Sequence, residues 1–242
     1  MIEIREFGGL GGFNNEWLKA RHHFSFGGYR DSARMGFGKL RVWNDDEIAP
    51  GTGFDPHPHR DMEIVTYVRE GAITHQDNLG NEGRTEAGDV QVMHAGTGII
   101  HAEYNKESVP TRLFQIWIEP DRHGVKPGWS ARSFPRAGSG LSVFASGAPG
   151  GGARWGRPVD AGTSALTLHA DAAVLAGTLR AGETARLTLA PGRKLYLVPV
   201  TGSVTVNGIL AKPRDGVAIS DETEVTIIAE HPVELVAVDV AA

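Results

Sequence analysis

The sequence predicts an all-β protein built from two antiparallel β-barrel or jelly-roll domains with few short helices. Two observations predict this class. First, 32 glycines and 13 prolines separate short runs in which apolar and polar residues alternate, and alternation at every second residue is typical of half-buried antiparallel strands. Second, the length of 242 residues exceeds the roughly 100–200 residues of one ordinary domain, so we expect two lobes.

Nine runs carry the strand pattern along the chain. Residues 15–23, NEWLKARHH, carry the clearest helix signal, and we expect one short helix there. No later segment holds an i, i+3, i+4 apolar pattern for long. The predicted strands are residues 39–43, 64–68, 89–93, 112–118, 185–189, 194–200, 203–208, 224–229 and 233–240.

Composition narrows the classes of function. The chain carries 24 basic and 29 acidic residues, a net charge of −5, and no basic run that could follow a phosphate backbone, so direct nucleic-acid binding is not expected. It contains no cysteine, so any bound metal must take nitrogen and oxygen ligands. The first residues show no signal-peptide pattern and no segment approaches 18 uninterrupted apolar residues, so we expect a soluble cytoplasmic protein.

Glycine, proline and serine dominate the middle of the chain. We therefore predict an N-terminal domain over residues 1–122, a linker over 123–162 and a C-terminal domain over 163–242. Trp129 and Trp155 lie in this linker and suggest that it packs on the lobes; a flexible tether is the alternative.

The two halves resemble each other weakly, as after an internal duplication. A strand, a glycine turn and another strand surround Gly71 in the first half and Gly202 in the second. Seven of the ten histidines precede the predicted linker and an eighth, His123, is its first residue, so we place the chemistry in the first lobe. Aligning the two glycines sets residues that are unlike metal ligands opposite His57, His59 and Glu63: they are Thr188, Ala190 and Lys194.

Two short segments carry pairs of metal-ligating residues. In an extended segment, side chains at i and i+2 share a face, with Cα atoms roughly 6.5–7 Å apart, so His57 and His59 can aim at one point, as can His101 and Glu103. Prolines 56 and 58 withhold N–H donors and suit a stiff edge segment. Three nitrogens and one carboxylate suit Fe(II), Mn(II), Co(II), Ni(II), Cu(II) or Zn(II), with two octahedral positions left open.

Other assignments stay open from the residues alone. The histidines could be scattered on the surface. Glu63 is a rival fourth ligand because it shares the parity of His57 and His59, although a straight strand would carry it about 13 Å from His59. His22 could line the mouth of a pocket, and His75 reads as a strand-end residue.

The segments that hold these pairs carry a family resemblance. GTGFDPHPHRDMEIVTYVREG resembles the first cupin motif and GDVQVMHAGTGIIHAEYN the second, although His94 stands at the usual proline and four residues separate Gly96 from His101. These departures, together with RHHFSFGGYRD, are similar to pirins and the pirin-like bacterial quercetin 2,3-dioxygenases. LHADAAVLAGTLRAGE and LAPGRKLYLVPVTGSVTVNG resemble the metal-free second cupin of that family.

The resemblance implies a bicupin fold and one divalent transition metal, with Fe(II) as the leading candidate. It implies that His57, His59, His101 and Glu103 hold this metal. It places Glu63 behind the site or in the core. It also implies O₂-dependent cleavage of a flavonol-like aromatic substrate with release of carbon monoxide, and Glu103 is the candidate base. The alternatives are a non-catalytic metal-binding or redox-sensing pirin that modulates a transcription factor or metabolic enzyme, or another cupin reaction.

Overall fold

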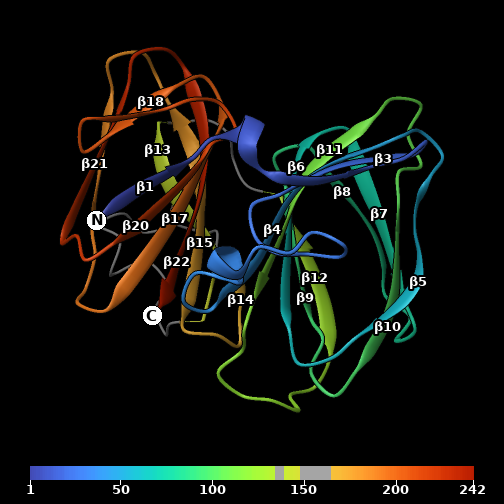
Figure 1. Cartoon of the computed structure of the whole chain (residues 1–242). Coiled ribbons are helices and arrows are strands. Elements are labelled where there is room, and N and C mark those ends of the chain that lie inside the picture. Colours follow the sequence, from blue (N-terminus) through green and yellow to red (C-terminus); the bar gives the residue numbers. More distant parts are fainter. Residues whose placement is uncertain (134–138, 148–164) are drawn as a thin grey trace.

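The computed structural model describes residues 1–133, 139–147 and 165–242, and it is all-β over these residues (Figure 1). Four sheets form two similar units, each with one seven-stranded and one four-stranded sheet. Within the described residues, every strand pair is antiparallel except β13 with β14. The only helices in this part of the chain are the short 3-10 helices η1 (Phe7–Gly9) and η2 (Ser32–Arg34).

The N-terminal unit contains the seven-stranded sheet in the order β12-β9-β6-β11-β4-β3-β2 and the four-stranded sheet in the order β5-β10-β7-β8. The strands of the larger sheet are β2 (Gly11–Asn14), β3 (Leu18–His22), β4 (Leu40–Ile48), β6 (Glu63–Glu70), β9 (Val90–His94), β11 (Thr111–Ile118) and β12 (Gly128–Arg132). The strands of the smaller sheet are β5 (Gly53–His59), β7 (Ala72–Asp77), β8 (Glu82–Glu86) and β10 (Ile99–Tyr104).

The C-terminal unit repeats this plan, with sheet orders β1-β20-β17-β22-β15-β13-β14 and β16-β21-β18-β19. The strands of its larger sheet are β1 (Ile2–Arg5), β13 (Gly140–Ser146), β14 (Leu166–Thr167), β15 (Ala172–Leu179), β17 (Arg193–Thr201), β20 (Gly216–Ser220) and β22 (Val233–Ala241). The strands of its smaller sheet are β16 (Thr184–Thr188), β18 (Val204–Val206), β19 (Ile209–Ala211) and β21 (Glu224–Ala229).

The all-β prediction is confirmed, and each of the nine predicted runs overlaps a strand. The helix predicted over residues 15–23 is wrong. Leu18, Ala20 and His22 are buried while Lys19 and Arg21 are exposed, an alternation of period two that belongs to a strand. This segment forms β3, which pairs with β4 in the larger sheet.

The glycine-rich range 123–162 contains strands of both units. Its residues 128–132 form β12 beside β9, and its residues 140–146 form β13 beside β15. Conversely, β1 at the N-terminus pairs with β20 of the C-terminal unit. The chain therefore crosses between the units twice, and the division at 122 and 163 stays a prediction. Trp155 lies outside the described residues.

The two larger sheets pack face to face, and their facing side chains form the largest apolar cluster. Trp43 on β4 is fully buried there, and its ring lies 5.5 Å from that of Tyr196 on β17. Because side chains alternate across a strand, the opposite face of the N-terminal larger sheet looks into its own barrel. In the described residues, no helix is long and apolar enough to cross a membrane.

Candidate metal centre

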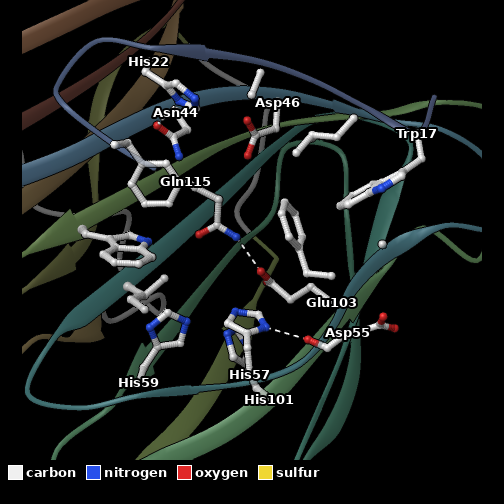
Figure 2. Close-up of a pocket in the computed structure, with 17 residues that line it drawn as sticks. Trp17, His22, Asn44, Asp46, Asp55, His57, His59, His101, Glu103 and Gln115 are labelled. Atoms are coloured by element: carbon white, nitrogen blue, oxygen red, sulfur yellow. Dashed lines mark hydrogen bonds between the residues drawn. The ribbon is translucent and has the colours of Figure 1, made fainter. Parts of the chain in front are cut away.

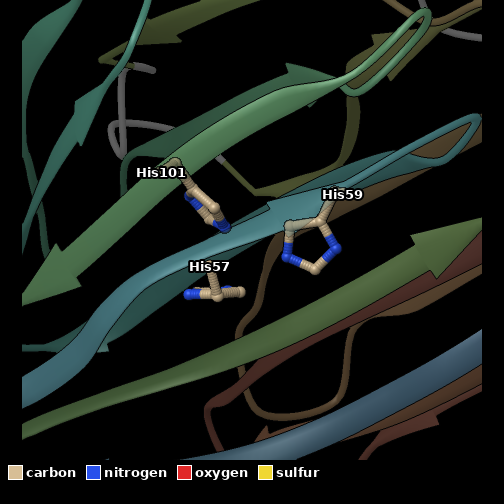
Figure 3. Close-up of side chains that lie close together, drawn as sticks. All are labelled: His57, His59 and His101. Atoms are coloured by element: carbon tan, nitrogen blue, oxygen red, sulfur yellow. The ribbon is translucent and has the colours of Figure 1, made fainter.

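The smaller N-terminal sheet brings three imidazoles together. Strand β5 is an edge strand that pairs with β10, in a register that sets His57 opposite His101 and His59 opposite Ile99. Figure 3 shows the three rings converging, and one nitrogen of each lies within 4.8 Å of the others. The prolines that alternate with the histidines fit this edge position, because an edge strand tolerates a missing N–H donor.

The hydrogen bonds leave nitrogens free to bind a cation. His57 Nδ1 donates to the carbonyl oxygen of Asp55 over 2.7 Å, so its Nε2 carries the lone pair. His101 Nε2 is buried and has no hydrogen-bond partner among the described residues. Burial, assisted by neighbouring imidazoles, lowers the pKa of His59 to about 4 and that of His101 to about 2, so both rings are neutral near pH 7, as metal ligation requires.

His75 on β7 supports His101 from behind. Its Nε2 lies 3.0 Å from Asp77 Oδ2 and its Nδ1 lies 3.4 Å from His101 Nδ1. Because the Asp77 carboxylate accepts the Nε2 proton, His75 Nδ1 is free to accept from His101, which leaves His101 Nε2 unprotonated. A carboxylate–histidine chain of this kind fixes the tautomer of a metal ligand. Trp129 stacks on His75 at 4.9 Å with nearly parallel rings.

Glu103 lies two residues beyond His101 on β10, past the point where the register against β5 shifts. One of its oxygens lies within 4.8 Å of ligand atoms of both His101 and His75. Gln91 and Gln115, on the inner face of the larger sheet, donate to its two oxygens. Burial raises the pKa of the Glu103 carboxyl to about 7, although these hydrogen bonds oppose the shift. His101 thus belongs to two candidate ligand groups, one with His57 and His59 and the other with His75 and Glu103. Imidazoles and a carboxylate are donors that suit a divalent transition metal.

Glu63, the rival ligand, lies elsewhere. Glu63 is buried on β6, next to Ile64. Because Ile64 lines the cavity and adjacent side chains of a strand point to opposite faces, Glu63 faces the C-terminal unit. Its Oε2 lies 2.6 Å from His94 Nδ1 and accepts the backbone N–H of His169 over 2.9 Å. These partners explain how a carboxylate is accommodated in the interface between the two units.

The histidine cluster opens into a cavity of about 480 Å³ inside the N-terminal barrel (Figure 2). Aromatic side chains form much of its wall, and Trp117 lies 4.9 Å from the His59 ring. His22 also lines the cavity, where its Nδ1 lies 2.8 Å from Asn44 Oδ1. The aromatic residues of the wall are Trp17, Phe26, Phe54 and Trp117.

Comparison with known proteins agrees with this architecture. Residues 4–118 match the Pirin family profile, and residues 159–240 match the quercetinase C-terminal cupin domain. A pirin-like protein of Caulobacter vibrioides is 55% identical over 241 residues, which cover 100% of both chains. The chain belongs to the pirin family.

Two Escherichia coli relatives bear on the chemistry of this pirin. A protein named quercetin 2,3-dioxygenase is 40% identical over 99% of this chain and 98% of its own length. The crystal structure of the bacterial pirin YhhW in complex with nickel(II) superposes with a TM-score of 0.90 at 40% identity, covering 100% of this chain and 99% of that one. The bicupin prediction is thereby confirmed, while the ligand assignment of His57, His59, His101 and Glu103 stays a prediction.

The sequence did not predict the residues that contact the candidate metal ligands from behind. His75 reads as a strand-end residue in the sequence, and Gln91 and Gln115 read as polar residues of apolar strands. One signal was present: each glutamine stands between two apolar residues, Val90 and Val92 or Phe114 and Ile116, on strands that are largely buried. A polar residue on a buried strand needs a partner, and here that partner is Glu103.

Proposed function

We propose that this pirin is a metal-dependent dioxygenase that cleaves the central ring of flavonols with O₂ and releases carbon monoxide. The observation that supports the proposal most directly is the cluster of three imidazoles at the wall of an aromatic-lined cavity, with the buried Glu103 carboxylate near His101. The names of relatives support the same reaction class. We further propose His57, His59, His101 and Glu103 as the ligands and Fe(II) as the first metal to test.

A bound divalent cation would act as a Lewis acid that acidifies a substrate hydroxyl and provides open positions for substrate and O₂. The protein's own contribution begins with the cavity. Its volume of about 480 Å³ lies within the range of small-molecule sites. The flat rings of Trp17, Phe54 and Trp117 are suited to hold a planar aromatic substrate by ring contacts.

Glu103 is suited to remove the proton of the flavonol 3-hydroxyl. A general base must lie within hydrogen-bond reach of the proton that it removes, and Glu103 lines the same cavity as His57, His59 and His101. Gln91 and Gln115 hold its two oxygens in place, so the carboxylate does not have to be reoriented for the reaction. Glu103 itself is buried, with 3% of its surface exposed, so its carboxyl has little contact with bulk water.

The test is turnover by protein that has been stripped of metal and reloaded with Fe(II), Mn(II), Co(II), Ni(II), Cu(II) or Zn(II). We expect O₂ uptake, loss of the quercetin absorbance and carbon monoxide release with at least one metal. Glu103→Gln should abolish turnover while elemental analysis still finds metal. Glu47→Gln, on the outer surface beside Lys19 and Arg112, is the control that keeps activity. Metal-loaded wild-type protein that consumes no O₂ with quercetin would overturn the proposal.

A further inference from the structure

Asp46 lines the same cavity, and its buried Oδ1 has no hydrogen-bond partner among the described residues. We propose that Asp46, with Gln115 beside it, forms a subsite that accepts hydrogen bonds from hydroxyl groups of the substrate other than the reacting one. This inference rests on the proposed function and specifies its substrate class: planar polyphenols with a hydroxyl on a ring remote from the metal. The subsite lies across the cavity from His57 and His59 (Figure 2).

Two adjacent carboxylates on β4 show why Asp46 is unusual. Asp45 points toward the C-terminal unit, where Arg69 and Arg214 donate to its two oxygens. Asp46 points the other way, into the cavity, with a side chain that is 2% exposed. Its Oδ1 is buried and has no hydrogen-bond partner in the described part of the chain. A buried acceptor without a donor is costly, and such groups are expected where a ligand supplies the donor.

Gln115 adds a second acceptor of the same kind. Its Nε2 donates to Glu103, whereas its Oε1 is buried without a partner in the described residues. The strand register places Gln115 opposite Asn44 on β4, and Asn44 opposite His22 on β3. Asp46 stands two residues from Asn44 on the same face. One polar row therefore crosses the inner face of the larger sheet. Asp46 and Gln115 line the cavity, and each keeps one buried acceptor oxygen without a partner among the described residues.

The chemistry of these acceptors selects the ligand. The oxygens of Asp46 and Gln115 accept hydrogen bonds from a hydroxyl group. Burial, with the nearby Asp45 and Glu103, raises the pKa of the Asp46 carboxyl, so a neutral hydroxyl is favoured over a further negative charge such as a carboxylate or phosphate. A second carboxyl, Glu103, lines the same cavity and further disfavours an anionic substituent. The aromatic walls favour a flat ring that carries the hydroxyl. An analogue without that hydroxyl would leave the acceptors unpaired, which typically costs tenfold or more in specificity.

The experiment compares two flavonols in wild-type protein and two variants, each loaded with the metal that supports turnover. Quercetin carries several ring hydroxyls, whereas 3-hydroxyflavone carries only the reacting one. We expect Asp46→Leu to reduce the ratio of kcat/KM for quercetin to that for 3-hydroxyflavone by about tenfold or more, with the metal content retained. Comparing ratios removes differences in intrinsic reactivity between the two flavonols. Glu47→Gln, at the next residue of β4 but on the outer face, should leave the ratio unchanged.

Asp46→Asn keeps the size of the side chain and guards against a folding defect in Asp46→Leu. Its amide replaces one acceptor by a donor, so it should also lower the quercetin ratio and should favour an O-methylated flavonol relative to wild type. An unchanged ratio in a folded, metal-loaded Asp46 variant would overturn the subsite. Failure of wild-type protein to turn over either flavonol would instead overturn the proposed function.

Discussion

Glu103 should make the stability of the metal-stripped protein depend on pH. Folding raises the pKa of its carboxyl from 4.5 to about 7, mainly through burial. At about 1.4 kcal/mol per pKa unit, ionised Glu103 therefore costs the folded protein about 3 kcal/mol. Because the folded pKa is the higher one, the folded protein retains a proton that the unfolded chain loses between pH 4.5 and about 7. Stability falls through that window and levels off above it.

Glu103→Gln removes this titration. Urea unfolding of chelator-treated protein should show the variant gaining about 3 kcal/mol on wild type between about pH 4.5 and pH 8. Glu47→Gln is the control of opposite sign: hydrogen bonds from Lys19 and Arg112 lower the pKa of Glu47, so its removal should cost relatively more at the higher pH. Equal pH slopes for wild type and Glu103→Gln would refute the conclusion that ionisation of the buried Glu103 carboxyl destabilises the folded protein. Adding a divalent cation should suppress the effect, because a cation favours the carboxylate.

Two further variants test the support around the site and between the units. Asp77→Asn removes the carboxylate that orients His75 behind His101. The metal affinity, measured in competition with a chromophoric chelator, should therefore fall about 10–100-fold. An unchanged Kd would show that His101 is oriented without the Asp77–His75 chain. Asp45→Ala leaves Arg69 and Arg214 without the carboxylate that they share between the two units. The free energy of unfolding should therefore drop by about 3–5 kcal/mol. A loss below about 1 kcal/mol would show that the arginines find other partners or water.

The sequence predicts the centre of the site better than its surroundings, for a physical reason. The parity of His57 and His59, and of His101 and Glu103, follows from strand geometry within one segment. His75 depends instead on the register of β7 against β10, which sets it opposite Glu103. Trp129 contacts His75 from β12, a strand within the glycine-rich range whose composition predicted a linker. Such relations between distant segments leave no local pattern in the sequence.

The helix error over residues 15–23 has a related cause. Lys19 and Arg21 on β3 are the exposed positions between Leu18, Ala20 and His22, and all five residues also suit a helix. Pairing with β4 decides between the two structures, because it satisfies the backbone and places His22 opposite Asn44. Tertiary pairing here overrides local propensity.

The two units show how one barrel plan carries a site in only one copy. Gly71 and Gly202 make equivalent turns with positive φ, 73° and 67°, so the backbone plan is shared. The interior of the C-terminal barrel, however, is filled by buried leucine, valine, isoleucine and alanine, and no candidate metal-ligand group lies there among the described residues. In the N-terminal barrel a polar row crosses the inner face of the larger sheet through Asn44, Gln115 and Gln91. Gln115 and Gln91 hold the Glu103 carboxyl, and Asn44 pairs with His22, so polar side chains that could serve a site are placed in this barrel at positions where a core would otherwise be apolar.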